Sequence, residues 1–422
     1  MGNSTPVIIG YDAISALGID LEQQWQGALA GKSGIGPLSR FPLKDDFPVR
    51  ISGQCPDIDD LNKNTNKKYP FLTARHQASW NSPIFKYGML TVARALERSG
   101  LEITPELAPR VAVTYSSAVG GLDAVLNADR RLQAENKLPP PYANPNSCIN
   151  MVGGKIAIQT GAQGPIVTPV TACATGLTSM ITGAMFLEQG RADVAICGAV
   201  DFALVEPIVA GFYTMNGVYI PKDGQPEEAP ESASRPFSVN RRGFVISEGA
   251  GAVILATPQF AKKHNLPFSI ELAGWGMTSD AHHFVAPFFK TVKQCMINAI
   301  DDAGITAADI AAINAHAAST RVGDKVEYDA ITALFGKKTP PVTANKSLIG
   351  HPMGASSVIE SIFSFQGMRD GMLPPTINYQ PDPEIEIDCV ANTKRKLDQE
   401  FILKNSFGFG GCNSCAVFKR IK

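Results

Sequence analysis

The sequence predicts an α/β protein whose sheet is covered by helices on both faces. Apolar β-rich runs alternate with segments of helical periodicity along all 422 residues, 44% of the residues are apolar, and 18% are charged. At ~100–200 residues per domain, this length corresponds to two or three units. The alternation recurs on both sides of about residue 260, so we expect two similar halves, residues 1–260 and 261–422.

Apolar runs predict the buried strands, and periodic segments predict the helices. Strands are expected at Val7–Gly10, Arg110–Tyr115, Asp193–Cys197, Ala252–Ala256, Phe268–Leu272, Ile310–Ala315 and Cys415–Ile421. Helices are expected at Leu21–Ala30, Ala174–Gln189, Lys290–Asp302, Asp324–Leu334 and Ala355–Met368. Composition predicts loops at Pro139–Pro145 and Pro221–Ser234.

Charge and cysteine content exclude several classes of protein. Lys and Arg number 38 against 39 Asp and Glu, and this balance argues against a protein that binds polyanions by bulk charge. No run reaches the ~18 apolar residues of a membrane-spanning helix, and the N-terminus resembles no targeting segment. Eight scattered cysteines are too few for a disulfide scaffold in so long a chain. We therefore expect a protein of the reducing cytoplasm.

The segment TPVTACATG, residues 168–176, places a cysteine between an apolar run and a helix. Cys173 lies where the predicted helix begins, and the positive end of a helix dipole stabilises a thiolate. Backbone N–H groups at the same place are suited to bind a developing oxyanion. A nucleophile with an oxyanion site nearby is one interpretation, and a buried structural cysteine is the other.

Two further segments carry a histidine among small residues. INAHAASTRVGD places His316 directly after an apolar strand, where loops often carry function. ANKSLIGHPMGAS places Lys346 and His351 five residues apart. A lysine in so apolar a stretch needs a partner, because desolvation of its charge is costly. A satisfied core histidine is the alternative interpretation of His316.

The glycine-rich segment NSFGFGGCN, residues 405–413, predicts a flexible loop or a close backbone approach. It lacks the Lys-Ser/Thr pair of a phosphate-binding loop, so nucleotide binding is not expected there. Cys412 and Cys415 form a lone C-x-x-C without a second pair of ligands, which disfavours zinc. We expect no metal site in this protein.

Taken together, these segments resemble the β-ketoacyl–acyl carrier protein synthases, the condensing enzymes of fatty-acid and type II polyketide synthesis. The likeness covers nearly the whole chain, in the order PVIIGYDAISALG, VTACATG, ASRPFSVNRRGFVISEGAG, INAHAASTRVGDKVEYDA, NKSLIGHPMGAS and NSFGFGG. The elongating branch, the ketoacyl synthase II type, is most similar, because the initiating branch carries Asn in place of one histidine. The resemblance implies a thiolase-like fold, in which two βαβαβ-type halves stack as α-β-α-β-α layers.

Position by position, the resemblance implies a catalytic triad of Cys173, His316 and His351. It also implies that Lys346 and Glu327 support the two histidines through hydrogen bonds. The resemblance further implies that Phe409, between Gly408 and Gly410, is a gating residue. It implies that Val119 and Phe212 line the acyl pocket. The implied oxyanion hole is formed by the backbone N–H groups of Cys173 and Phe409.

The implied reaction is a decarboxylative Claisen condensation that uses no cofactor. An acyl group carried on Cys173 would react with malonyl–acyl carrier protein to give 3-oxoacyl–acyl carrier protein, in fatty-acid or polyketide-like elongation. Two alternatives stay open. A non-catalytic partner subunit, like the chain-length factors, would typically lack the nucleophilic cysteine. A coenzyme A-dependent enzyme of the thiolase type would carry a second cysteine in place of one histidine.

The expected partner is an acidic acyl carrier protein, so a basic patch should surround the pocket mouth. The candidate residues are Lys63, Lys67, Lys68, Arg130 and Arg131, and a solvated charge run is the alternative interpretation. The resemblance further implies a homodimer, or a heterodimer with a paralogous subunit. Neither a nucleic acid partner nor a membrane span is expected.

The chain departs from the family pattern around the implied site. Ala317 and Ala318 stand where Gly-Thr is usual, Ser238 and Arg242 stand where Asp is usual, and Cys412 stands where Thr is usual. The missing hydroxyl and carboxyl groups belong near the implied pocket and the channel for the carrier's phosphopantetheine. They put the choice of substrate in question more than the reaction, because all three triad residues are present.

Overall fold

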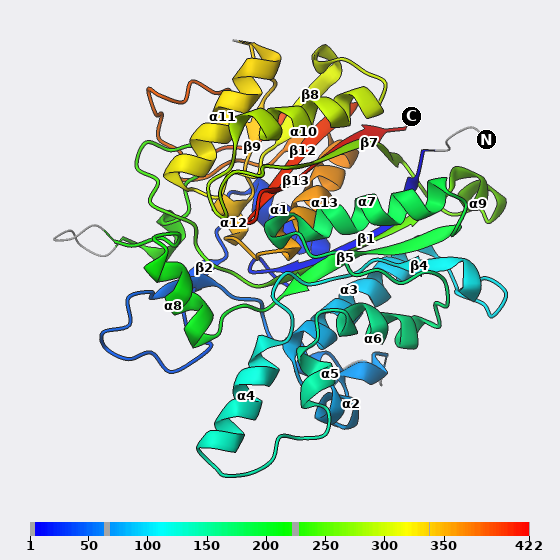
Figure 1. Ribbon diagram of the computed structural model, residues 1–422. Coiled ribbons are helices and arrows are strands. Elements are labelled where there is room, and N and C mark those ends of the chain that lie inside the picture. Colours follow the sequence, from blue (N-terminus) through cyan, green and yellow to red (C-terminus); the bar gives the residue numbers. More distant parts are fainter. Residues whose placement is uncertain (1–4, 63–67, 222–227, 337, 422) are drawn as a thin grey trace.

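The computed structural model describes residues 5–62, 68–221, 228–336 and 338–421 (Figure 1). The strands of the main sheet are β1 (Val7–Ser15), β4 (Val111–Val113), β5 (Val194–Asp201), β6 (Gly249–Ala256), β7 (Ile270–Ser279), β8 (Ile310–Asn314), β9 (Val342–Thr343), β12 (Phe401–Gly408) and β13 (Cys412–Arg420). Small ribbons pair β2 (Ile35–Pro37) with β3 (Ile51–Gly53) and β10 (Met372–Leu373) with β11 (Arg395–Lys396). The helices are α1 (Leu21–Leu29), α2 (Ala74–Ser79), α3 (Pro83–Ser99), α4 (Leu122–Gln133), α5 (Ala143–Ser147), α6 (Met151–Thr160), α7 (Thr175–Glu188), α8 (Glu206–Thr214), α9 (Pro258–Lys263), α10 (Phe289–Asp302), α11 (Arg321–Phe335), α12 (Lys346–Ile349) and α13 (Ala355–Asp370).

The main sheet is mixed and has the strand order β4-β5-β6-β1-β7-β13-β12-β8-β9. Strands from before residue 260 lie together on one side, and strands from after it lie together on the other. The two groups join through a short antiparallel contact between β1 and β7, in which Val7 pairs with Glu271 and Ile8 pairs with Ile270. The division into halves at residue 260 stays a prediction.

Helices lie outside and between the two groups of strands. α3 packs against β1, β5 and β6, whereas α10 packs against β7, β12 and β13. α7 contacts β5, β6 and β13, and α13 contacts strands of both groups, including β6, β1 and β12. The middle position of α7 and α13 is visible in Figure 1. The layers therefore follow the order α-β-α-β-α, as expected.

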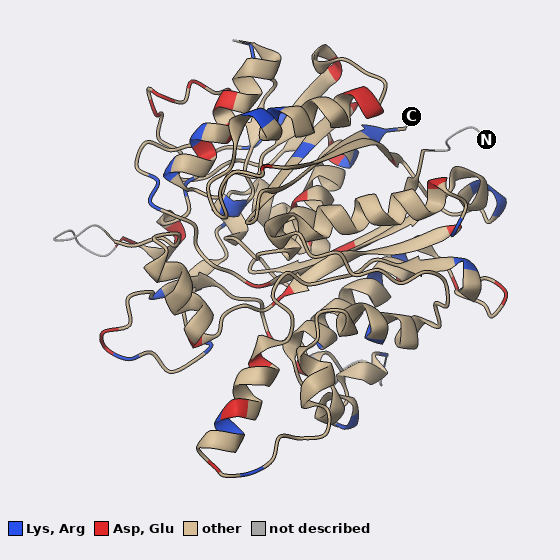
Figure 2. Ribbon diagram, viewed as in Figure 1, with Lys and Arg blue, Asp and Glu red and all other residues tan. Residues whose placement is uncertain are grey.

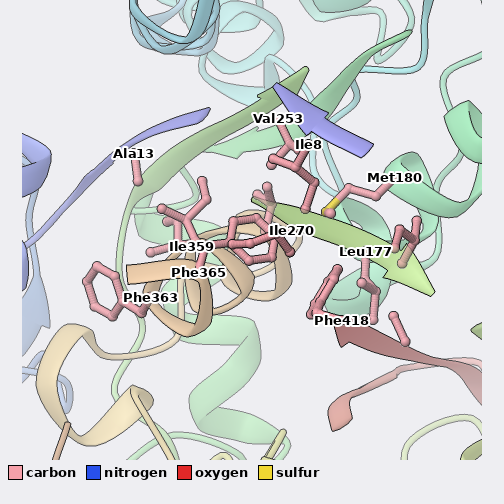
Figure 3. Packing of buried hydrophobic residues seen from close by; sticks show 14 of the residues in the cluster. Ile8, Ala13, Leu177, Met180, Val253, Ile270, Ile359, Phe363, Phe365 and Phe418 are labelled. Atoms are coloured by element: carbon pink, nitrogen blue, oxygen red, sulfur yellow. The ribbon is translucent and has the colours of Figure 1, made fainter. Parts of the chain in front are cut away.

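The largest core cluster surrounds the middle layer (Figure 3). Leu177 of α7 and Ile359 of α13 lie there among side chains from both groups of strands, such as Val253 of β6 and Phe418 of β13. Every residue of α13 from Ala355 to Met368 is buried. A helix buried all round is normally apolar all round, so the buried carboxylate of Glu360 in α13 must find partners inside the protein.

All seven predicted strands and all five predicted helices occur, with shifted ends. β7 begins at Ile270 and extends to Ser279, well past the predicted Phe268–Leu272. β5 likewise continues to Asp201. The hydrophobic pattern locates a buried strand, but pairing with the neighbouring strands decides where it ends, and the local pattern does not contain that information.

Two loop predictions are wrong in part. Residues 405–413 form no flexible loop, because β12 and β13 pair from Phe401–Lys419 to Gly408–Cys412 and leave a tight turn at residues 409–411. The predicted loop Pro139–Pro145 contains the start of α5. In the second loop, residues 222–227 lie outside the described residues, and Pro230–Ser232 form a short 3-10 helix.

Charged residues are dispersed around the sheet rather than gathered by sign. Figure 2 shows Lys and Arg interspersed with Asp and Glu on the helices and loops. Within the described parts of the chain, no helix combines the length and the apolar character that crossing a membrane requires. The ribbon in Figure 2 therefore shows residues of both signs along most elements, in line with the balanced composition.

Candidate active site

One cavity of about 660 Å³ brings together the three residues of the expected triad. Cys173, His316 and His351 all line it. Cys173 lies in a 3-10 turn, Ala172–Ala174, directly before α7. The preceding Ala172 has a φ of +48°, a conformation that is unfavourable for a residue with a Cβ. This sharp turn between an extended segment and a helix places the thiol at the cavity wall.

The thiol of Cys173 is neutral in the resting protein. Burial raises its pKa to about 12, although the charge of Lys346 and the backbone N–H groups of Phe409 and Cys173 act in the opposite direction. At neutral pH, a pKa of about 12 leaves roughly one molecule in 10⁵ as thiolate. Formation of the nucleophile therefore requires a proton acceptor in the site.

The expectation that the α7 N-terminus by itself favours a thiolate is wrong. The N–H of Gly176 donates to the carbonyl of Gly354 at 3.0 Å, and the N–H of Leu177 donates to Ser357 Oγ at 2.9 Å. The first turn of α7 is thus already satisfied by the N-terminal end of α13. The N–H groups that remain directed at the sulfur are those of Cys173 and Phe409, which are the groups expected for the oxyanion hole.

The two imidazoles face each other in the cavity. The ring centroids of His316 and His351 lie 5.7 Å apart, at an interplanar angle of 80°. Burial lowers the pKa of both rings well below the usual value, and the charge of Lys346 lowers it further. Within the described residues, neither Nδ1 has a hydrogen-bond partner. Both rings are therefore neutral, and each keeps one nitrogen able to donate and one able to accept.

Lys346 and Glu327 hold the main chain at His316 rather than the imidazole rings. Lys346 Nζ donates to the carbonyl of His316 at 2.6 Å. The Glu327 carboxylate accepts the N–H of His316 at 2.9 Å and the N–H of Ala317 at 2.7 Å. The predicted hydrogen bonds are thus made to the backbone at His316 and Ala317 rather than to an imidazole. They fix the backbone and so orient the His316 ring indirectly.

Sequence reasoning missed two members of this network. Glu360 on α13 accepts from Lys346 at 2.6 Å and from Lys404 on β12 at 2.7 Å, and all three side chains are buried. The signal was present in the sequence: Glu360 and Lys404 are single charges inside the apolar runs SSVIESIF and FILKNSFG. Because an isolated charge in a core segment is costly, each such residue predicts a buried partner.

Phe409 lies in the turn of the β12–β13 hairpin, against the cavity. Its ring is 6.3 Å from the ring of Phe212, and both residues line the cavity together with Val119. Gly410 and Gly411 follow with φ of +80° and +73°, which only glycine adopts without strain. The N–H of Gly410 donates to the carbonyl of Phe284 at 2.8 Å. The turn is therefore tight, and it is anchored on one side.

We expect Gly408→Ala to slow acyl loading of the cysteine by roughly 10²-fold, the size of effect seen when reacting groups are misplaced by about 1 Å. A Cβ at this position would lie 2.3 Å from the carbonyl oxygen of Thr171 and 3.2 Å from the N of Cys173. The hairpin and the nucleophile turn would have to separate, and the Phe409 N–H would leave the sulfur. Acyl-enzyme mass against time measures the rate. Unchanged loading by the folded variant would contradict this close fit.

The expected carrier-protein residues are spread over several elements. Lys68 pairs with Glu97 on α3 at 2.8 Å, Arg130 and Arg131 are exposed near the end of α4, and Lys63 and Lys67 lie outside the described residues. Two arginines that sequence reasoning did not select for this role, Arg242 and Arg321, line the cavity that contains the triad. Arg321 is exposed at the start of α11, so basic groups do lie where the cavity opens.

Two of the departures from the family pattern lie on the cavity wall. Ala318 and Arg242 line it. Ser238 is buried, and its hydroxyl accepts the N–H of Gln380 at 2.9 Å. Ala317 is buried and donates its N–H to Glu327. Ala318 therefore presents a methyl group to the cavity, and Arg242 adds a cation to its lining.

Comparisons with known proteins agree with this geometry. The model of the β-ketoacyl synthase N-terminal domain matches residues 5–261, and that of the C-terminal domain matches residues 270–380. The chain is 35% identical to 3-oxoacyl-[acyl-carrier-protein] synthase 2 of Coxiella burnetii, and the match covers 98% of each protein. Among solved structures, the ishigamide ketosynthase/chain length factor is similar over the full length of both chains, with 26% identity and a TM-score of 0.87. A β-ketoacyl synthase from Burkholderia phymatum STM815 has 24% identity and a TM-score of 0.89, and the match covers 99% of this chain and 100% of that one. Because the two family models together match residues 5–261 and 270–380, and the Coxiella relative is similar over 98% of the chain, the protein belongs to the β-ketoacyl synthase family.

Proposed function

We propose that this protein catalyses the decarboxylative condensation of an acyl group with malonyl–acyl carrier protein to give 3-oxoacyl–acyl carrier protein. The observation that carries the proposal is the cavity shared by the Cys173 thiol and the neutral imidazoles of His316 and His351. The curated relative from Coxiella burnetii bears the corresponding name and is 35% identical to this chain.

In the first half-reaction, the acyl group moves from the carrier to the enzyme. A neutral imidazole accepts the thiol proton of Cys173, and the sulfur attacks the acyl-thioester carbonyl. The N–H groups of Cys173 and Phe409 stabilise the oxyanion that develops. The bond between the carbonyl carbon and the carrier sulfur then breaks, and the carrier thiol leaves with a proton. The product is an acyl group bound to Cys173 Sγ.

In the second half-reaction, malonyl–acyl carrier protein loses its carboxylate as carbon dioxide. The electron pair of the broken C–C bond passes to the thioester as an enolate, whose oxygen accepts N–H donation from His316 and His351. The enolate carbon attacks the acyl carbonyl, the new C–C bond forms, and the bond to Cys173 Sγ breaks. The mostly apolar cavity keeps water away from the carbanion.

The geometry favours this reaction over the two alternatives. A chain-length-factor-like subunit needs no nucleophile, yet Cys173 lies in the cavity with two backbone N–H groups directed at its sulfur. A thiolase-type site would hold a second cysteine in place of one histidine, yet the described lining of this cavity contains both histidines and Cys173 as its single cysteine. We therefore rank both alternatives behind condensation.

An assay with defined malonyl donors distinguishes the three functional hypotheses: condensation, a coenzyme A-dependent reaction and a non-catalytic subunit. Acyl–carrier protein is supplied together with malonyl–carrier protein or with malonyl-coenzyme A, and carbon dioxide and the 3-oxoacyl product are measured. Condensation requires both products from malonyl–carrier protein. Turnover with malonyl-coenzyme A alone would favour the coenzyme A-dependent reading, and failure to form an acyl-enzyme would favour the non-catalytic subunit.

We infer that the carrier protein docks where the cavity opens. Arg242 and Arg321 line the cavity, Arg321 is exposed at the start of α11, and both add positive charge for an acidic partner. Lys68, Arg130 and Arg131 remain candidates for a wider basic surface, together with Lys63 and Lys67, which lie outside the described residues.

We also propose that the chain works as a dimer. Large apolar side chains are exposed on α6, on the extended segment after it, and on α7: Ile158, Ile166, Val167, Val170 and Met185. The extended segment hydrogen-bonds β4 through Pro165 and Val167, and it forms an outer edge of the sheet. Apolar edges of this kind favour pairing with another chain.

Homodimerisation and pairing with a paralogous subunit use the same surface. Light scattering of the purified chain at micromolar concentration should give the mass of a dimer if the partner is a second copy. A fully active monomer would contradict the proposal. The compartment we infer is the reducing cytoplasm, because all eight cysteines carry free thiols.

A further inference from the structure

Lys404 is a fully buried cation beneath the candidate active site. It lies on β12, three residues after Phe401 and five before Phe409. Its Nζ donates to Glu360 Oε2 at 2.7 Å and to the carbonyl of Asn405 at 2.7 Å. It also lies 3.5 Å from the carbonyl oxygen of Ala315, the residue before His316. The ammonium of Lys404 thus connects β12, which leads to the turn that carries Phe409, with the end of β8, which leads to His316.

Glu360 is shared between two cations. Its Oε1 accepts from Lys346 and its Oε2 accepts from Lys404. Lys346 already has a second acceptor in the carbonyl of His316. Glu360 alone would leave one positive charge in excess, and the next carboxylate is Glu327, whose charge also acts on Lys404. The two lysines and the two glutamates therefore balance only when Lys404 is charged.

The charged and titratable groups that act on Lys404 come from several elements packed against β12. Glu360 on α13, Lys346 on α12 and Glu327 on α11 act on it directly. Its own charge acts on Cys415 of β13, on Glu327, and on both imidazoles. Burial lowers the pKa of Lys404, and the carboxylates of Glu360 and Glu327 oppose that change.

We propose that Lys404 is a positioning residue of the condensation site: its ammonium holds the strand ends that lead to His316 and Phe409, and its positive charge adds to that of Lys346 beside the two buried imidazoles. The inference rests on the proposed function. A neutral imidazole is the acceptor for the Cys173 proton, whereas an imidazolium has no free lone pair to accept it. Lys404 touches no reacting atom and acts through Glu360, the backbone and its charge.

Lys404→Met is expected to move the acidic limb of the acyl-loading rate to higher pH. Loss of a buried positive charge raises the pKa of the nearby imidazoles, so they become protonated at a higher pH. The shift should be about 1 pH unit, the order expected for one unit charge at an effective dielectric constant of about 20. Acyl-enzyme mass, measured against time from acidic to neutral pH, gives the profile. Lys404→Arg retains the positive charge, so the acidic limb of its acyl-loading rate should lie at the same pH as in the wild-type protein.

The matched control is Lys155→Met. Lys155 is also buried, but it lies on α6 over the ring of Trp80 and outside the described lining of the cavity. This variant removes a buried lysine and should leave the pH profile unchanged. If folded Lys404→Met has the wild-type profile, the proposal is overturned. If Lys404→Met has the shifted profile and Lys404→Arg has the wild-type profile, the proposal is supported.

A second measurement does not depend on turnover or on a stable variant. Histidine-selective NMR of the wild-type protein follows the six imidazoles, three of which line the cavity: His283, His316 and His351. The test concerns His316 and His351. Both should stay neutral well below pH 6.5. A midpoint at or above 6.5 for either ring overturns the role of Lys404, even if condensation is observed. Neutral rings in a protein without condensation activity would instead count against the proposed function alone.

Discussion

Cys173→Ala is expected to abolish acyl loading and condensation while the protein still releases carbon dioxide from malonyl–carrier protein. The described lining of the cavity offers the acyl group no second thiol, because Cys173 is its single cysteine. Decarboxylation requires donors to the thioester oxygen, and these are the imidazoles and the backbone N–H of Phe409, all of which the variant retains. Acyl-enzyme mass and labelled carbon dioxide release, measured on the same preparation, report the two half-reactions separately.

The control for this variant is Cys197→Ala. Cys197 is a fully buried cysteine of β5 that does not line the cavity, so its loss should leave both half-reactions intact. If folded Cys173→Ala also stops releasing carbon dioxide, the thiol takes part in decarboxylation and the two half-reactions are not separable in this way.

His316→Ala and His351→Ala are each expected to lower decarboxylation by roughly 10²–10³-fold, as for the loss of one oxyanion donor. The donors are effective here because both rings are buried and neutral, and because Lys346 and Glu327 fix the backbone of His316. Labelled carbon dioxide release from malonyl–carrier protein measures the effect without the need for an acyl primer.

The same variants test how Cys173 loses its proton. With a thiol pKa of about 12 and the first turn of α7 already hydrogen-bonded, loading depends on an imidazole as acceptor. At least one of the two variants should therefore also load slowly. His264→Ala, at the end of α9 with its ring stacked on Phe260, serves as the control. Wild-type loading by both active-site variants would show that the proton leaves by another route.

Local patterns in the sequence predicted seven of the nine strands of the main sheet, five of the thirteen described α-helices, and the positions of the chemical groups. Apolar runs located the seven strands because burial of a β-strand depends on its own side chains. The position of Cys173 at the start of a helix was predicted from the small residues that follow an apolar run, and His316 was predicted from its place after β8. The family resemblance added the association of these segments, which no single segment contains.

Other features depend on contacts between distant residues, so local patterns could not predict them. Of the two alternatives for the glycines of residues 405–413, the flexible loop is wrong because β12 pairs with β13 up to the turn, whereas the close backbone approach occurs at Gly408. The helix dipole predicted a thiolate at Cys173, but α13 occupies the first N–H groups of α7, and burial raises the pKa. Both wrong expectations were reasonable for an isolated segment, and each failed because a second segment packs against it.

The sequence by itself determined the α/β class, the segments that carry the nucleophile and the histidines, and the family to which the chain is similar. Only the tertiary structure decided the charge state of the site. Lys346, Glu360, Lys404 and Glu327 come from four separate elements, and their charges balance only because α12, α13, β12 and α11 meet near His316. The physical reason is that a pKa depends on burial and on charges nearby in space, whatever their separation along the chain.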